Sequence, residues 1–531
     1  MENSEQTGSS GFTRQHWTRP HWTRNRGKVI TAGLLATGLL VWGFVPGNQG
    51  LALVCTVADN LGKPYVLSDC PPTRLDIETA RQLKDYTRQA LESRDRGQLD
   101  QAFDKLQKAL TLAELLSQKN PDNDAWQQDL ARVYSQIGNL EQRRGNALLA
   151  LAALASEQEI IRRALARTPD SLDWQADHRD NLHRKGEIYQ ATDQWDKALE
   201  LYRPAIELAG EILAREPDKI GNHFILTALH NKTGEVHESK GDLAAALLSY
   251  QAALDGGTVL AATFPEEPRL LYSQYKLHST IGHLYEQQDN KEAAITSYEN
   301  ALATARVMIE RAPQLKSLLL ANLSLLHTMT GDLQRDQDHP DDAARNFQAA
   351  IDFYTAELGN SPAADKASRE NNLHQLFALQ HRIGNIRSDQ TDHQTALTHF
   401  EAAMAALQEL RELAPENHLW SMAIYTVHLN LGEEQQALGD TTAALSHFQS
   451  VVSNADPLVQ NEPEEPAHRA YIAFATYYSG MILLDQDQKT AARAQLEQSQ
   501  TLMLALMNSD WADDLSSNLM EVESILSKLG S

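Results

Sequence analysis

A pattern of small residues that returns about every 48 residues constrains the fold of this 531-residue chain more than any other feature. Residues 230–254 read HNKTGEVHESKGDLAAALLSYQAAL, and residues 278–302 read HSTIGHLYEQQDNKEAAITSYENAL. The glycine of these segments forms a column along the chain: Ala90 in the first unit, then Gly138, Gly186, Gly234, Gly282, Gly331, Gly384, Gly432 and Gly480. Repetition at a fixed period is typical of a solenoid rather than of several separate domains.

Three further columns accompany the glycine. An alanine follows it by 12 residues in all nine units: Ala102, Ala150, Ala198, Ala246, Ala294, Ala343, Ala396, Ala444 and Ala492. A large residue follows one helical turn later: Leu106, Leu154, Tyr202, Tyr250, Tyr298, Phe347, Phe400, Phe448 and Leu496. A proline closes eight units: Pro121, Pro169, Pro217, Pro265, Pro313, Pro362, Pro415 and Pro463. A small residue and then a large one predict close helix packing, and proline ends a helix, so each unit is predicted to be a helical hairpin.

This pattern resembles that of the tetratricopeptide repeat family, which has a glycine in the first helix, an alanine and an aromatic residue in the second, and a closing proline. The resemblance covers about residues 74–510, but the period is 48 rather than the usual 34, so both helices gain about two turns. It implies an all-α fold, a right-handed superhelical solenoid of about nine helical hairpins whose first helices line the concave side. Residues 511–531 are expected to form a capping helix.

Two insertions interrupt the period, one residue between Pro313 and Gly331 and five between Pro362 and Gly384. The second falls in NSPAADKASRENN, which is rich in turn-forming residues. We expect either a longer loop or a local change of superhelix there.

The N-terminus carries a hydrophobic segment, residues 29–45, without a charged residue. Basic residues precede it, which by the positive-inside rule places residues 1–28 in the cytoplasm. We expect a single transmembrane helix, residues 29–46, in a bacterial inner membrane, followed by an exported linker, residues 47–73, and a periplasmic or extracellular repeat domain. The alternative is a cleaved signal peptide, which would export the same repeats.

The two cysteines, Cys55 and Cys70, lie in the predicted linker and bracket a turn-forming sequence. In an oxidising compartment they are expected to form a disulfide. Two free thiols or an interchain bond are the alternatives. A metal site is not expected, because no third cysteine or nearby histidine completes a ligand set.

A net charge of −24 argues against nucleic acid or anionic lipid as a partner of the repeats. It favours basic or polar protein or peptide partners, unless it only keeps a long solenoid soluble. The sequence contains no phosphate-binding loop, nucleophile elbow, HExxH or haem motif. We therefore expect no catalysis, no cofactor and no metal.

One column of histidines, His230, His278, His327 and His428, stands four residues before the glycine. Neighbouring first helices lie about 10 Å apart, too far for one column to bind a single metal ion. We expect these rings to pack between the two helices of a hairpin, bonded to a polar neighbour. A pH-dependent stiffness of the solenoid is the alternative.

Partner binding is assigned to the polar columns of the first helices, one and four residues after the glycine, which the family resemblance places on the concave face. We expect these residues to be unneeded for packing and free to bind an extended peptide or a helix; the alternative is a solvated face without a ligand. They are Asn139, Gln142, Glu187, Gln190, Glu235, Glu238, His283, Glu286, Asp332, Arg335, Asn385, Glu433 and Gln436.

Two other functions compete with this protein-binding scaffold. One is a solenoid that binds a small ligand or envelope glycan, for which Trp126, Trp174 and Trp420 share a column that could supply stacking faces. The other is a self-associating spacer or assembly factor of an envelope complex. All three are non-catalytic.

Overall fold

The computed structural model describes residues 74–263, 268–360, 366–415, 417–461 and 465–529. Within these ranges every regular element is a helix. The chain divides into two compact units, one ending at Trp174 and the other beginning at Gln175. The all-α class predicted from the repeat is confirmed for this part of the chain.

The first unit contains two helical hairpins and the start of a further helix. Within it, α3 packs against α4, α4 against α5, and α5 against α6. The helices are α3 (Arg74–Asp95), α4 (Leu99–Lys119), α5 (Asp124–Arg143) and α6 (Ala147–Arg167), and α7 (Leu172–Gln190) begins here and continues into the second unit.

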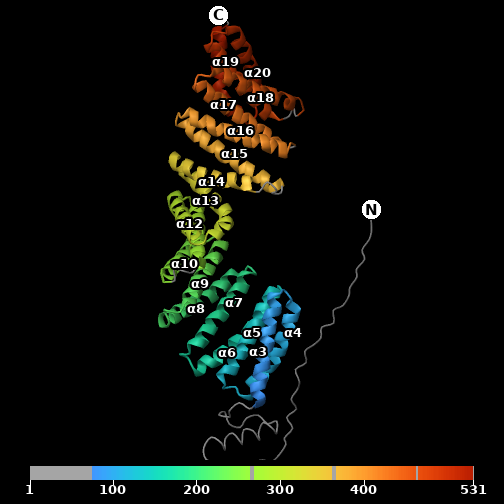
Figure 1. The fold of residues 1–531 in the computed structure, drawn as a ribbon, viewed down its shortest axis with the longest axis vertical. Coiled ribbons are helices and arrows are strands. Elements are labelled where there is room, and N and C mark those ends of the chain that lie inside the picture. The colour runs from blue at the N-terminus through green and yellow to red at the C-terminus, as the bar shows by residue number, and fades with distance from the viewer. Residues whose placement is uncertain (1–73, 264–267, 361–365, 416, 462–464, 530–531) are drawn as a thin grey trace, which may run out of the picture. The chain divides into compact units, whose positions relative to one another are not determined.

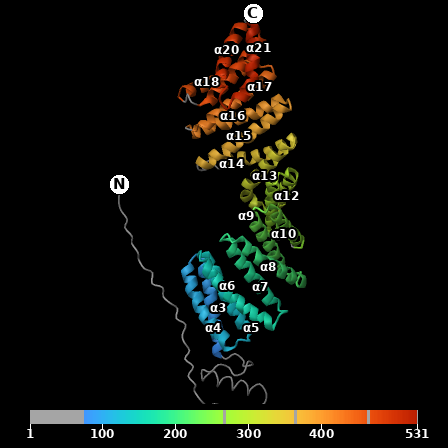
Figure 2. The same ribbon diagram turned by 180° about the vertical axis from the view of Figure 1, so that it is seen from behind.

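The second unit continues the same pattern, and from α8 to α21 each helix packs against its successor (Figures 1 and 2). Its helices after α7 are α8 (Trp195–Arg215), α9 (Ile220–Ser239), α10 (Leu243–Thr263), α11 (Pro268–Gln287), α12 (Lys291–Arg311), α13 (Lys316–Asp336), α14 (Pro340–Asn360), α15 (Lys366–Asp389), α16 (His393–Leu413), α17 (His418–Ala437), α18 (Thr441–Asn461), α19 (Pro466–Asp485), α20 (Lys489–Leu506) and α21 (Ala512–Leu529). Among the described residues, α3 to α20 thus form nine hairpins and α21 follows them.

The contact between the glycine column and the large-residue column holds each hairpin together. A Cβ atom placed on any of the eight glycines would lie less than 3.0 Å from the side chain that stands 16 residues later. At Gly234, for example, it would lie 2.7 Å from Cε1 of Tyr250. The backbone of the first helix therefore touches the ring or leucine of the second helix, an approach that leaves no room for a side chain.

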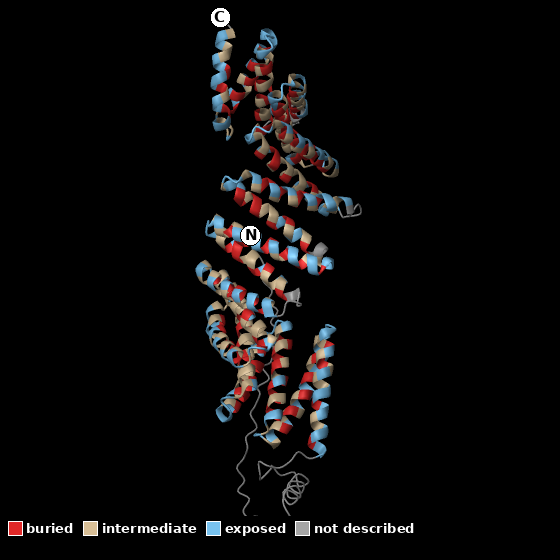
Figure 3. Ribbon diagram, turned by 60° about the vertical axis from the view of Figure 1, so that its left-hand side comes forward, coloured by how far each residue is buried: buried red, intermediate tan, exposed pale blue. Residues whose placement is uncertain are grey.

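The alanine column supports this contact from the second helix. All nine alanines are at most 1% exposed, and all nine large residues are at most 3% exposed. Buried positions accordingly run along the helix faces that meet neighbouring helices, while exposed positions lie on the outer faces (Figure 3). The packing roles predicted for both columns are confirmed.

The turn inside each hairpin depends on one residue in the left-handed backbone region. These nine residues have φ between +56° and +86° and recur in step with the glycine column. They are Gly97, Gly145, Asp193, Gly241, Asp289, Asp338, Thr391, Gly439 and Asp487. Glycine and aspartate tolerate this conformation, whereas β-branched Thr391 adopts it at a steric cost.

The closing prolines and the insertions act at the ends of hairpins. Pro121, Pro169, Pro217 and Pro415 each stand two residues after the last residue of a second helix. The one-residue insertion coincides with a 3₁₀ turn, Pro313–Leu315, before α13. Residues 366–372, expected in a long loop, instead belong to α15, which is 24 residues long. Part of this segment thus extends a helix.

Helix α10 is long and apolar enough to cross a membrane by length and composition. However, Ala246, Tyr250, Ala253 and Leu254 of α10 are buried in the hairpin with α9, as in the other units. One such helix is weak evidence for a membrane span. The predicted transmembrane segment, residues 29–46, and the predicted Cys55–Cys70 disulfide lie outside the described residues.

The glycine contact predicts that replacing two helical glycines by alanine changes the free energy of unfolding in opposite directions. Gly331→Ala should destabilise the protein by about 1–3 kcal/mol, because its Cβ would lie 2.6 Å from Cε1 of buried Phe347. Gly210→Ala should stabilise it by about 0.5–1 kcal/mol, because nothing lies within 4 Å of the added atom and alanine favours the helix. Urea unfolding followed by circular dichroism compares the two, and equal midpoints would contradict the packing role of the column.

Candidate functional site

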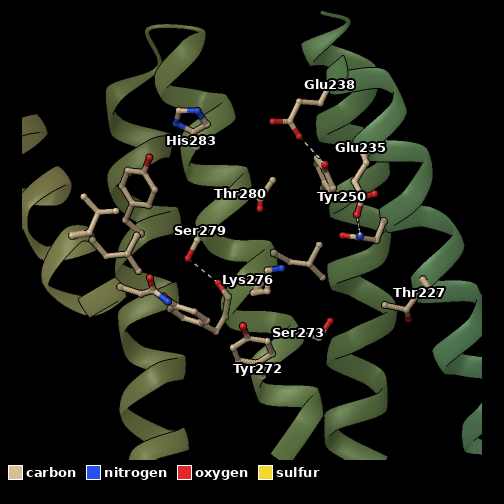
Figure 4. A pocket seen from close by; sticks show the side chains of 18 of the residues that line it. Thr227, Glu235, Glu238, Tyr250, Tyr272, Ser273, Lys276, Ser279, Thr280 and His283 are labelled. Atoms are coloured by element: carbon tan, nitrogen blue, oxygen red, sulfur yellow. Dashed lines mark hydrogen bonds between the residues drawn. The ribbon is translucent and has the colours of Figure 1, made fainter. Parts of the chain in front are cut away.

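A groove of about 660 Å³ is formed by the first helices of three consecutive hairpins, α9, α11 and α13. Each helix contributes one face to the walls, and Tyr250 and Tyr298 reach the groove from the second helices α10 and α12. Figure 4 shows Glu238 and His283 toward one end, Tyr272 and Ser273 toward the other, and Lys276 between them. The groove lies entirely within the second unit.

The two tyrosines are tied to carboxylates on the first helix of their own hairpin. The Tyr250 hydroxyl donates to Oε2 of Glu238 at 2.7 Å, and the Tyr298 hydroxyl donates to Oε2 of Glu286 at 2.8 Å. Burial, reinforced by the acceptor carboxylate, raises the pKa of both tyrosines, so both stay protonated donors. Glu238 is consequently held in place in the groove, and Glu286, which does not line it, is held in the same way on α11.

The same bond corrects the expectation that these polar columns are unneeded for packing. Tyr202 donates to Oε1 of Gln190 at 2.9 Å, so all three tyrosine hairpins use the residue four positions after the glycine as an acceptor. The phenylalanine hairpins carry Arg335, Ser388 and Gln436 at that position. Since phenylalanine has no hydroxyl, the position is released from this role there.

Glu235, one residue after the glycine of α9, also has structural partners. It accepts from Asn231 Nδ2 at 2.7 Å, Lys232 Nζ at 2.8 Å and Gln190 Nε2 at 3.1 Å. Gln190 belongs to the preceding first helix, α7, so Glu235 links two neighbouring hairpins. The lysine offsets much of its charge, because the ion pair is half-buried.

The predicted binding residues are spread along the first helices, and only Glu235, Glu238 and His283 line this groove. Outside it, the exposed residues are Arg335, Asn385 and Glu433, and the half-buried ones are Asn139, Gln142, Glu187, Gln190, Glu286, Asp332 and Gln436. Burial raises the pKa of Asp332 even though Arg382 lies 3.2 Å away.

The apolar part of the groove was missed by the sequence analysis. Tyr272 is 43% exposed and Leu325 is 56% exposed, and Phe224 lines the same groove from α9. Leu325 stands in a column, six residues before the glycine, whose other groove members are Ala228 and Lys276. The sequence offered one signal for this apolar surface, a leucine at position 325 in a column that is not conserved as apolar between units.

The histidine column packs within hairpins, as predicted, at two positions where the ring bond is defined. His327 Nδ1 lies 2.7 Å from Asn346 Oδ1, and His428 Nδ1 lies 3.1 Å from His447 Nδ1. Both bonds join a first helix to its second helix. In the described part of the chain, no group of three or more histidine, cysteine, aspartate or glutamate side chains is placed to hold a metal ion.

The tryptophan column offers no stacking surface. Trp126 and Trp420 are 8% exposed and Trp174 is 1% exposed. These rings pack at the starts of the first helices, so the observation that would favour a glycan-binding solenoid is missing from these three positions.

Two segments of the chain, residues 182–216 and 275–306, match sequence models described as tetratricopeptide repeat. No curated protein matches the chain. The solved apo form of RapI is 12% identical, with a TM-score of 0.37, over 78% of this chain and 98% of its own. BtubC from P. vanneervenii is 16% identical, with a TM-score of 0.29, over 50% of this chain and 92% of its own. The TPR2AB domain of yeast Sti1 in its complex with pHSP90 is 14% identical, with a TM-score of 0.25, over 65% of this chain and 98% of its own.

The chain therefore contains tetratricopeptide repeats, matched at residues 182–216 and 275–306. This assignment rests on the two repeat matches, both in the second unit, and on the glycine, alanine and large-residue packing that they share with the other hairpins. Tetratricopeptide repeats imply a protein-interaction scaffold, so the groove between α9, α11 and α13 is the candidate site for a partner.

The His428–His447 pair predicts a loss of stability in mild acid. Burial, then His447 and Arg411, lower the pKa of His428 from 6.5 to about 4. Between these values the unfolded chain binds more protons than the folded chain, so stability falls as pH drops from 7 to 5. His447→Asn should reduce this fall by on the order of 1 kcal/mol, because it removes one titrating ring and reproduces the His327–Asn346 pair.

Urea midpoints at pH 7 and pH 5 measure this effect. His339→Asn, at an exposed position before α14, serves as the control and should leave the pH dependence unchanged. An identical fall in the wild type and His447→Asn would show that the pair does not control the acid response.

Proposed function

We propose that this protein is a membrane-anchored scaffold that binds protein partners in the groove between α9, α11 and α13, without a chemical step. The supporting observation is the groove itself, which is lined both by exposed apolar side chains, Tyr272 and Leu325, and by the carboxylates Glu235 and Glu238. Apolar anchors surrounded by fixed polar groups are the usual composition of a protein-binding site.

Its partners are basic or polar protein segments. The chain carries a net charge of −24, and two carboxylates but only one ammonium group, that of Lys276, line the groove. This balance attracts cationic segments and repels nucleic acid. Other polar residues of the first helices, such as Asn139, Asn385 and Glu433, extend the contact surface beyond this groove.

A photo-crosslinking amino acid placed in the groove tests the binding function in cells. Introduced at Lys276, it should capture a defined set of proteins, because this side chain is exposed inside the groove. The matched control is Leu248, which is 76% exposed on the second helix α10. The proposal fails if both positions capture the same proteins in equal amounts.

The membrane topology is part of the proposal. Residues 1–28 are the cytoplasmic tail, residues 29–46 the anchor in a bacterial inner membrane, residues 47–73 the exported linker with a Cys55–Cys70 disulfide, residues 74–510 the repeat domain and residues 511–531 its cap. The basic residues before the uncharged segment support this orientation.

Protease added to intact spheroplasts tests the orientation. The repeat domain should be digested without lysis, while an epitope fused before residue 1 should remain protected. Mass spectrometry of the mature protein should show an uncleaved N-terminus. Protection of the repeat domain until the membrane is lysed would overturn the proposed topology.

A further inference from the structure

The two ends of the groove differ in chemistry. Tyr272 of α11 exposes a large apolar surface at one end, and the exposed Leu325 of α13 and Phe224 of α9 line the same groove. The other end holds Glu238 and His283, as Figure 4 shows. A ligand that fills the groove would therefore contact an apolar surface at one end and an acidic surface at the other.

The acidic end keeps its charge available for a ligand. Glu238 and Glu286 each give one oxygen to a tyrosine hydroxyl, and a neutral donor does not cancel the carboxylate charge. Glu235 differs because Lys232 lies 2.8 Å from it and offsets its charge. Glu286 does not line the groove but occupies the position on α11 equivalent to that of Glu238 on α9, about 10 Å away, so it is a second carboxylate near the acidic end.

The middle of the groove is polar without being acidic. Asn231 of α9 lines the groove together with Lys276 and Thr280 of α11, which lie between its two ends. An extended segment presents unpaired backbone N–H and C=O groups to such side chains, whereas a helix has already paired its own. The lining therefore favours an extended occupant.

The length of the groove sets the spacing of the ligand. Tyr272 and His283 are eleven residues apart on α11, which corresponds to about 16 Å along the helix. An extended chain covers about 16 Å in roughly five residues. We infer that the groove recognises an extended protein segment with an arginine or lysine about five positions from an aromatic or large aliphatic residue. This inference rests on the proposed function of the groove as a protein-binding site.

Labelled synthetic peptides test the inference with the full-length protein. Each probe is a nonapeptide of serine and glycine with one Arg and one Trp separated by two, five or eight positions, made in both orders. Fluorescence anisotropy should show that a five-position peptide in one order binds about tenfold more tightly than the other separations. Replacing its Arg by Glu should abolish binding at the same concentration.

Variants of the protein separate charge from structure. Glu238→Gln with Glu286→Gln keeps an acceptor for both tyrosines and removes both charges, so it should weaken the five-position peptide about tenfold and flatten its salt dependence. Leu325→Ser should weaken the same peptide through its tryptophan. Glu310→Gln, an exposed glutamate on α12, is the matched control and should change nothing.

The outcomes distinguish the inference from the function on which it rests. Binding that ignores separation or charge, or that survives the double glutamine variant, overturns the inference and leaves a groove that binds peptides. If no peptide binds while Lys276 still captures proteins in cells, the inference is overturned alone. Loss of both peptide binding and specific capture overturns the proposed function as well.

Discussion

The close contact between a glycine backbone and a large side chain, repeated in eight of the nine described hairpins, is the constraint on which the rest of the structure depends. It sets how near the two helices of a hairpin lie and fixes their register, because only the residue 16 positions later can cover the glycine. Once this register is set, the residue four positions after the glycine stands opposite the ring's para position. The packing contact and the surface chemistry are thus geometrically coupled.

In the tyrosine hairpins this coupling positions charged groups at the candidate site. Their hydroxyls hold Glu238 and Glu286 in fixed positions, so the acidic groups are oriented before any partner arrives. Such preorganisation lowers the entropy lost on binding. The apolar residues that line the groove occupy variable columns. The residues that pack the hairpins and the residues that would select a partner therefore stand at different positions of the repeat.

Much of the fold could be predicted from the sequence. The same small and large residues recur in nine units, so the pattern predicts a helical hairpin even where one unit departs from it. The left-handed turn column was missed, since aspartate and Thr391 occupy positions where a glycine search finds only four members. The acceptor role of Glu238 was missed because its partner, Tyr250, lies 12 residues away on another helix. The groove could not be located either, because it depends on exposed side chains such as Leu325 that differ between units.

The alternation of ring types along the repeats has a consequence for how this surface can change. Where the second helix carries tyrosine, replacing the facing acceptor leaves a buried hydroxyl without a hydrogen-bond partner. The tyrosine and its acceptor must therefore change together. Where it carries phenylalanine, as at Phe347 and Phe448, the facing residue is free to vary alone. The hairpins α13–α14 and α17–α18 are therefore the segments in which new charges can be introduced one substitution at a time, while the hairpins from α9 to α12 retain the charges of Glu238 and Glu286 in matched pairs with their tyrosines.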